Sequence, residues 1–111
     1  MNSFSFITAL SGLIFLVTGL IMKLRPPEKI NSLYGYRTPR SMKNQENWTE
    51  ANRYSAILLI RSSILMLLLA SLAPFFIQNE TIAWISAIIL VIIVALNLII
   101  MTEYHLKKMF G

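Results

Sequence analysis

Residues 81–102 read TIAWISAIILVIIVALNLIIMT, a stretch of 22 residues without a charged side chain. An α-helix that crosses a bilayer needs about 20 predominantly apolar residues, because the hydrocarbon core is about 30 Å thick. In a strand of a membrane barrel apolar and polar residues alternate, and here they do not. This stretch therefore predicts a membrane-spanning helix.

Two further stretches of the chain have the same character. Residues 4–22 contain no charged side chain, and neither do residues 62–79, whose apolar character extends back to Ala56 with Arg61 as an interruption. Because the bilayer core offers no water to satisfy backbone groups, such runs must be helices. The sequence predicts an all-α integral membrane protein with three transmembrane helices, at about residues 4–22, 55–77 and 81–102, in a single membrane domain 1–111 with a structured loop at 23–54.

The composition of the whole chain agrees with this interpretation. Of its 111 residues, 56% are hydrophobic and 14% are charged, whereas soluble domains carry about 25% charged residues. These values exclude a soluble domain and a disordered tail, and the length leaves room for one domain. Cysteine is absent, so disulfides, thiolate metal sites and a cysteine nucleophile are excluded.

The placement of Lys and Arg predicts the orientation in the membrane. Seven of the ten basic residues lie between the first and second spans, Lys107 and Lys108 lie in the C-terminal tail, and residues 1–5 have none. Short loops rich in Lys and Arg stay in the cytoplasm, so we expect the N-terminus outside and the loop and C-terminus inside. Basic residues that follow the first apolar stretch, rather than precede it, also favour a retained span over a cleaved signal peptide. The net charge of +5 is thereby assigned to topology, and nucleic acid is not an expected partner.

Small residues give each predicted helix one face for close packing. They are Thr8, Ser11, Gly12 and Gly19 in the first span, Ser55, Ser62, Ser63, Ala70 and Ala73 in the second, and Ala83, Ala87 and Ala95 in the third. Helices in lipid associate through such residues. Pro74 is expected to bend or end the second helix, and the short connection to Thr81 requires an antiparallel hairpin. We expect a compact bundle or packing with further copies of the chain.

Two polar residues, Arg61 and Asn97, lie inside the apolar runs. Arg61 lies seven residues beyond Tyr54, about 10 Å along a helix, and the antiparallel arrangement places Asn97 at a similar depth. A charged residue within a span faces a partner or a cavity unless it snorkels to the interface. Two interpretations stay open: a snorkelling Arg61, or a buried Arg61 paired with a polar residue of the third helix (Asn97, Glu103 or Tyr104).

The loop contains residues that end the first helix, permit a turn and begin the next helix. Two prolines at positions 26 and 27 end the first helix, and Gly35 permits a tight turn between two tyrosines. Ser41 or Asn44 is expected to cap a helix that continues through Trp48 into the second span.

The order of residues in the loop is more specific than its composition. It reads Asn31, then Tyr34-Gly35-Tyr36-Arg37-Thr38-Pro39, then Asn44, Trp48 and Asn52 before a membrane span. This series, here called the loop motif (residues 31–53), resembles the signature of the SdpI family of bacterial membrane immunity proteins. That signature is approximately an Asn, a core of Tyr-Gly-X-Arg-Thr, and a Trp followed by an Asn or His before a span. A span before the motif and a hairpin after it extend the resemblance loosely to the whole chain.

The resemblance implies protection of a bacterial cell against a secreted peptide toxin, by binding the toxin or shielding its target, from a place in the cytoplasmic membrane. The best-known member has more spans and also relays the presence of toxin to a transcriptional repressor. A single three-span unit favours immunity over signalling, and it favours an oligomer. Carried over residue by residue, the motif positions are Asn31, Tyr34, Gly35, Arg37, Thr38, Asn44, Trp48 and Asn52.

The side chains of the loop motif are suited to two roles. The guanidinium of Arg37 is a rigid forked donor for a carboxylate, a phosphate or carbonyl groups. Thr38 and three asparagines (Asn31, Asn44 and Asn52) are expected to complete a hydrogen-bonded cluster near the exit of the first span. Such a cluster serves as a structural clasp or as a ligand site, and the two roles are compatible.

Enzymatic activity is not expected from this sequence. The single histidine, His105, lies in the C-terminal tail, where a solvated interfacial residue is expected. No His/Glu pair has metal-ligand spacing and no glycine-rich phosphate loop is present, so no cofactor or metal is expected.

Two other function classes stay open. One is a small oligomeric transport or channel component, in which Arg61 and Asn97 line a path. The other is a membrane scaffold or sensor whose basic loop recruits a cytoplasmic partner. The expected partners are therefore membrane lipids, a peptide toxin, further copies of the chain and a cytoplasmic regulator.

Overall fold

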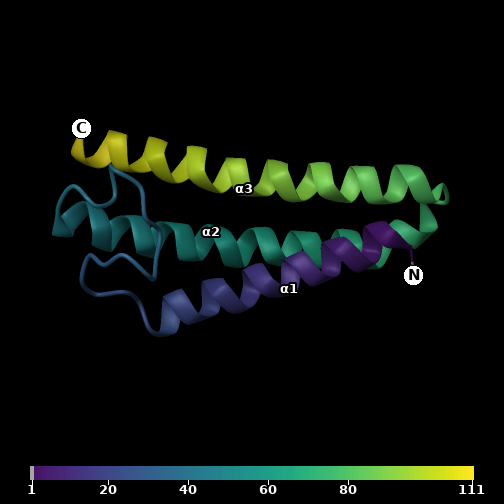
Figure 1. Ribbon diagram of the computed structural model, residues 1–111, viewed down its shortest axis with the longest axis horizontal. Coiled ribbons are helices and arrows are strands. Elements are labelled where there is room, and N and C mark those ends of the chain that lie inside the picture. The colour runs from purple at the N-terminus through teal and green to yellow at the C-terminus, as the bar shows by residue number, and fades with distance from the viewer. Residues whose placement is uncertain (1) are drawn as a thin grey trace.

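The computed structural model describes residues 2–111, which form three long α-helices, one short 3-10 helix and no β-strand. Along the chain these are α1 (Ser3–Leu24), α2 (Gln45–Leu72), η1 (Ala73–Phe75) and α3 (Glu80–Phe110). The α-helices run along the long axis of a body of 48 × 25 × 20 Å (Figure 1). The N-terminus and the α2–α3 turn lie at one end, called the hairpin end, and residues 25–44 and the C-terminus lie at the other, called the loop end (Figure 1). The prediction of an all-α chain is confirmed.

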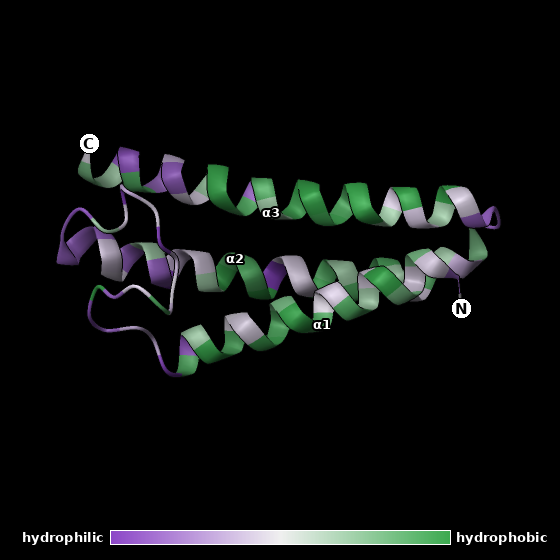
Figure 2. Ribbon diagram, viewed as in Figure 1, coloured by the Kyte–Doolittle hydropathy of each residue, from purple (hydrophilic) through white to green (hydrophobic). Residues whose placement is uncertain are grey.

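Each α-helix contains a segment that is long and apolar enough to cross a membrane. Hydrophilic residues gather at the loop end and in the hairpin turn, whereas apolar residues fill most of the length between them (Figure 2). Large apolar side chains on the outside of the bundle are exposed, among them Leu68 at 55%, Ile92 at 53% and Ile100 at 64%. An apolar surface of this extent is what a protein presents to lipid. The chain is a multi-pass membrane protein.

α1 packs closely against α2 because small residues leave room at the interface. A Cβ atom at Gly19 would lie 2.9 Å from Ile60 Cγ1, and one at Gly12 would lie 3.2 Å from Met66 Cβ. Thr8 is fully buried on the same stripe of α1. The predicted packing face of the first span is confirmed at Thr8, Gly12 and Gly19.

The predicted small-residue faces of α2 and α3 are buried as well. Ser55, Ser63, Ala70, Ala73, Ala83 and Ala87 are at most 5% exposed, whereas Ser11, Ser62 and Ala95 are half-buried. Ser5 of α1 adds a polar contact, because its hydroxyl donates to the backbone oxygen of Ala70 at 2.7 Å. Close packing and interhelical hydrogen bonds of this kind hold helices together in lipid, where burial of apolar surface alone gives no driving force.

Pro74 ends α2 as predicted. The α-helix stops at Leu72 and Pro74 lies within η1, because a proline has no N–H to continue the α-helical ladder. Asn79 then caps α3 by accepting a hydrogen bond from the Ile82 N–H at 3.1 Å. The antiparallel hairpin is confirmed, although the helical part of the second span ends before the predicted boundary at residue 77.

At the loop end, both α2 and α3 extend beyond the apolar limits read from the sequence. α2 begins ten residues before the predicted span, and its N-cap is Asn44, whose Oδ1 accepts from the Asn47 N–H at 2.8 Å. Of the two predicted caps, Asn44 is therefore the one used. α3 runs to Phe110, eight residues beyond the predicted span. The C-terminal segment, expected as a tail, is helical and packs on the bundle.

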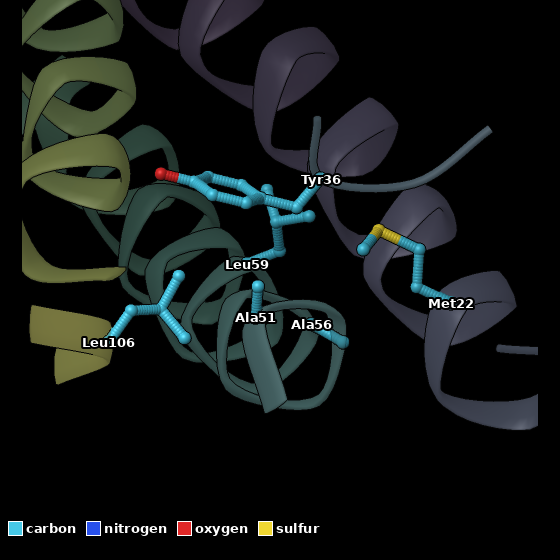
Figure 3. Close-up of a cluster of buried hydrophobic side chains, with 6 residues drawn as sticks. All are labelled: Met22, Tyr36, Ala51, Ala56, Leu59 and Leu106. Carbon is cyan, nitrogen blue, oxygen red and sulfur yellow. The ribbon is translucent and has the colours of Figure 1, made fainter. Parts of the chain in front are cut away.

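Two buried clusters hold the bundle, one at each end. The cluster at the loop end joins all three α-helices to the loop through Met22, Tyr36, Ala51, Ala56, Leu59 and Leu106 (Figure 3). The cluster at the hairpin end consists of Phe4, Ala73, Ala83 and Ala87. Figure 3 shows the ring of Tyr36 reaching from the loop towards α3. The loop is consequently a part of the core rather than a mobile connection.

Candidate functional site

Trp48 anchors the loop to α2. Its side chain is fully buried, and its indole Nε1–H donates to the backbone oxygen of Pro27 at 2.6 Å. This hydrogen bond joins the start of α2 to the chain that has just left α1. A buried carbonyl without such a donor would cost about 1–3 kcal/mol, so the indole fixes where the loop returns to the bundle.

Asn52, one turn beyond Trp48, holds the backbone of the loop motif. Its Oδ1 accepts from the Tyr36 N–H at 2.6 Å, and its Nδ2 donates to the Trp48 backbone oxygen at 2.9 Å. The side chain is 2% exposed. A carboxylate offers no donor and a hydroxyl is too short for both partners, so this position requires an amide.

Gly35 allows the motif backbone to lie directly on these two side chains. Its φ is +114°, a conformation that side chains other than glycine rarely adopt. A Cβ atom would lie 2.6 Å from Asn52 Oδ1, 2.8 Å from Pro27 Cγ and 3.2 Å from the Trp48 ring. Both the backbone conformation and the close approach require glycine here.

Asn31 and Tyr34 shape the first half of the loop. The Oδ1 of Asn31 accepts from the N–H groups of Leu33 and Tyr34 at 2.9 and 2.7 Å, a turn that asparagine forms readily. The Tyr34 hydroxyl donates to the backbone oxygen of Arg25 at 2.6 Å. The loop is thereby fastened to the end of α1.

Thr38 and Ser41 close the second half of the loop by reciprocal hydrogen bonds. The Thr38 N–H donates to Ser41 Oγ at 2.8 Å, and the Ser41 N–H donates to Thr38 Oγ1 at 3.1 Å. Ser41 is fully buried and also donates to the Tyr36 backbone oxygen at 3.0 Å. The sequence predicts Ser41 only as one of two candidate helix caps. The signal for its actual role was the Thr-Pro-Arg-Ser order, which places two hydroxyl side chains three residues apart.

The single hydrogen-bonded cluster expected from Thr38 and the three asparagines does not form. Asn31, Thr38, Asn44 and Asn52 each bind a different stretch of backbone, as described above. The reason is that each side chain satisfies the turn or cap nearest to it, and only Asn52 reaches a distant segment. Together they act as a clasp that fixes the loop on the bundle.

Arg37 differs from the rest of the loop motif. Its side chain is exposed, and within residues 2–111 its guanidinium makes neither a hydrogen bond nor a salt bridge. The residues on both sides are held in place, because the Tyr36 N–H is bound by Asn52 and Thr38 is bound by Ser41. A rigid backbone therefore presents a forked cationic donor that is not used within the described chain.

The loop is also connected to α3. The Arg40 guanidinium lies 3.2 Å from the Glu103 carboxylate, and the Tyr36 hydroxyl donates to the Ile99 backbone oxygen at 3.3 Å. Burial, and then the nearby Glu103 carboxylate, raise the pKa of the Tyr36 hydroxyl far above its ordinary value. The hydroxyl consequently stays protonated and remains a donor.

His105 is not the solvated residue that was expected. Its ring stacks on that of Tyr54 with centroids 4.0 Å apart, and its Nε2 lies 2.6 Å from Glu50 Oε2. Arg53 donates to both oxygens of the same carboxylate at 2.7 Å. These hydrogen bonds, that of Arg53 above all, hold the pKa of Glu50 at about 2, below its ordinary 4.5. The continuation of α3 brings the histidine to α2, which the sequence did not predict.

Arg61 and Asn97 do not form the buried pair considered from the sequence. Both side chains are exposed on the outside of the bundle. Within residues 2–111 no hydrogen bond joins them, and Glu103, another candidate partner of Arg61, is bound to Arg40 instead. The helix face that carries Arg61 points away from the buried face of α2. A path lined by the two residues would need several copies of the chain.

A crevice of about 290 Å³ lies beneath the loop motif, and residues of all three α-helices line it. Ile14 and Leu98 contribute apolar surface, and Gly35 and Tyr36 form the part nearest the loop end. Thr18 and Ser55 supply two hydroxyl groups, of which that of Thr18 donates to the Ile14 backbone oxygen at 2.8 Å. The crevice is shaped for an apolar group with one or two polar atoms.

The geometry favours binding at the loop end. The clasp provides a rigid platform, Arg37 provides a cationic donor on its surface, and the crevice provides an apolar cavity below it. Among residues 2–111, no three His, Asp or Glu side chains lie close enough together to hold a metal ion.

Comparisons with known proteins agree on one family. The family model described as "SdpI/YfhL protein family" matches residues 28–102. The chain is also 53% identical over 55 residues to the uncharacterized protein YfhL of Bacillus subtilis strain 168. That alignment covers 50% of this chain and 50% of the relative, so about half of the relative's length is matched. No solved structure matches the chain.

Proposed function

Since this chain belongs to the SdpI/YfhL family and has three helices able to span a membrane, we propose that it is an immunity protein of the bacterial cytoplasmic membrane. It protects the cell against a secreted peptide toxin by binding the toxin, and it does so without catalysis. The loop end faces the cytoplasm, in keeping with the seven basic residues between the first two spans.

The observation that carries this proposal is the difference between Arg37 and the other positions of the loop motif. The other seven of its eight positions shape the loop, cap α2 or fasten the loop to the bundle, whereas Arg37 is exposed and makes no bond within residues 2–111. A loop that served only as a clasp would need no arginine at that position. The guanidinium is suited to a carboxylate or to free carbonyl groups, both of which a peptide carries at its C-terminus.

The crevice beneath the loop motif is the second contact in this proposal. A toxin that acts on membranes has apolar side chains, and about 290 Å³ accommodates one or two of them. Binding there keeps the toxin from its target or from assembling in the bilayer. The alternative, in which the protein shields the target itself, does not need the crevice.

The direct test is a challenge of cells with and without the gene. Both strains are exposed to cell-free culture supernatant of the parent strain, with and without prior protease treatment. We expect growth inhibition of the deletion strain only, and we expect protease treatment to abolish that inhibition. Equal growth of the two strains in the untreated supernatant would contradict the immunity role.

Matched variants distinguish the loss of a toxin contact from disruption of the fold. Arg37→Ala is compared with Arg25→Ala, which removes an exposed arginine of the same loop outside the motif. We expect loss of protection for Arg37→Ala at a normal level of membrane-inserted protein, and full protection for Arg25→Ala. Trp48→Ala also abolishes protection, but through disorder of the loop, which faster proteolysis of that loop reports.

The crevice is tested in the same way. Leu98→Trp fills it, whereas Leu96→Trp adds the same side chain at a position of α3 that is 52% exposed. Toxin capture predicts loss of protection for Leu98→Trp only. Full protection by a folded Leu98→Trp protein would favour target shielding over capture.

A further inference from the structure

A second cavity at the loop end involves none of the eight motif positions and shares only Met22 with the crevice. It measures about 260 Å³ and lies between the last turn of α1 and the second to fourth turns of α2. Met22, Ala56 and Ile57 form its apolar part. Lys23, Thr49 and Arg53 form its polar part. Charged and apolar groups are therefore present in one small cavity.

The two kinds of group are ordered along the helix axis. Thr49 and Ile57 are eight residues apart on α2, which corresponds to about 12 Å. Thr49 and Arg53 precede the apolar run of α2, whereas Ala56 and Ile57 begin it. The cavity thus changes from polar to apolar in the direction that leads from the membrane surface into the hydrocarbon.

Three hydrogen-bond donors at the polar end are free to bind a ligand. Within residues 2–111 the ammonium of Lys23 makes no salt bridge or hydrogen bond, and its side chain is exposed. Arg53 uses Nε and Nη2 on Glu50, which holds the guanidinium in place while Nη1 makes no bond within the same residues. The Thr49 hydroxyl accepts from Gln45 at 3.1 Å and retains its own hydrogen for donation.

We propose that this cavity binds an anionic phospholipid of the leaflet that the loop end faces. Its phosphate lies between Lys23 and Arg53, and the first part of an acyl chain lies against Ala56 and Ile57. The order of donors and apolar side chains matches the order of head group and chain in a lipid. The free ammonium gives the site a net positive charge, because Glu50 offsets only the charge of Arg53.

The test measures lipid binding to the purified full chain by native mass spectrometry in detergent. Phosphatidylglycerol and phosphatidylcholine with the same acyl chains are added over a range of concentrations. We expect tighter binding of phosphatidylglycerol. Lys23→Gln should weaken it about fivefold, the effect of about 1 kcal/mol per basic side chain near an anionic surface. The same change should weaken phosphatidylcholine binding less, because the choline cation offsets the charge of its phosphate. Lys43→Gln, which removes an exposed lysine of the loop away from the cavity, should change neither.

Ile57→Trp tests the apolar part of the site, since it fills the cavity and leaves every charge in place. We expect it to weaken phosphatidylglycerol binding while circular dichroism shows unchanged helicity. Equal effects of Lys23→Gln and Lys43→Gln would overturn the proposal in favour of general attraction to a basic surface. Unchanged lipid binding by Ile57→Trp would overturn it as well.

Discussion

At the scale of single residues, the glycine of the loop motif decides whether the clasp closes. Gly35 combines a φ of +114° with a contact distance of 2.6 Å from a would-be Cβ to Asn52 Oδ1. We expect Gly35→Ala to destabilise the closed loop by at least about 1–2 kcal/mol, the cost of a left-handed conformation for an alanine. Trypsin should then cut the loop several times faster, while the three helices persist in circular dichroism.

A second glycine provides the control for this prediction. Gly111 also has a positive φ, of +87°, but a Cβ atom there would meet nothing within 4 Å. Gly111→Ala should leave the proteolysis of the loop unchanged. If Gly35→Ala is cleaved at the wild-type rate, the loop is not held as described.

The sequence allowed part of this residue-level description and not the rest. The sequence predicts Ser41 or Asn44 as the cap and Gly35 as a turn, and the structure uses Asn44, because capping and turn formation depend on a few neighbouring residues. The bond from Trp48 to Pro27 joins positions 21 residues apart, and that from Asn52 to Tyr36 joins positions 16 apart. Such partners depend on how the loop folds over α2, and no local pattern determines that path.

At the scale of elements, the contact between α1 and α2 depends on the absence of side chains. A Cβ atom at Gly19 would meet Ile60 at 2.9 Å and the backbone oxygen of Ala56 at 3.2 Å, and backbone cannot move aside easily. We expect Gly19→Ala to lower the unfolding free energy by about 1–3 kcal/mol, as overpacking does. Gly12→Ala, whose nearest atoms lie at 3.2 Å or more, should cost less.

Unfolding by titration with sodium dodecyl sulfate, followed by circular dichroism, measures both variants. Leu20→Ala serves as the control, because Leu20 is 40% exposed and lies beside Gly19 on the outward face of α1. Equal stability of the Gly19→Ala and Leu20→Ala proteins would mean that α1 does not approach α2 this closely.

The Glu50 carboxylate, bound by Arg53 of α2 and then by His105 of α3, makes the loop end sensitive to acid. The pKa of Glu50 is about 2 in the folded protein and 4.5 for an ordinary carboxyl, so folding favours its ionised form. Stabilisation from this group is complete above about pH 4.5 and is lost as the pH falls towards 2. We therefore expect wild type to be more stable than Glu50→Gln at pH 6, and the difference to disappear near pH 2.

Thermal unfolding of both proteins over this pH range gives the measurement. The remaining carboxyl groups titrate in both proteins, so their effects cancel in the difference. A stability difference that stays constant from pH 6 to pH 2 would show that the charge of Glu50 does not stabilise the loop end through Arg53 and His105.

The extension of α3 shows why element ends were predicted less well than element types. The apolar run stops at residue 102, and the sequence offers no stop signal such as proline before Phe110. Helix propensity and burial of Leu106 in the loop-end cluster carry the helix onward. Hydropathy marks where a helix leaves the lipid, which is a different point from where the helix ends.

At the scale of the whole molecule, spans and hairpin followed from the sequence because length and hydropathy are local quantities. The clasp, the crevice and the second cavity at the loop end did not follow from the sequence, because each depends on the relative placement of α1, α2 and the loop. The crevice, for example, combines Ile14, Gly35 and Leu98, which are far apart in the chain. Its existence depends on the loop's return over the bundle.

The orientation of the bundle connects these sites to function and is open to a direct test. The chain has no cysteine, so Ser32→Cys in the loop and Gln78→Cys at the hairpin end each introduce a single reactive thiol at an exposed position. The excess of Lys and Arg in the loop predicts that Gln78→Cys reacts with a membrane-impermeant maleimide in intact cells. Ser32→Cys should react only after the membrane is permeabilised. The reverse pattern would place Arg37 and the second cavity on the outer side of the membrane. Arg37 would then be the first contact of an arriving toxin, and the cavity would contact lipids of the outer leaflet.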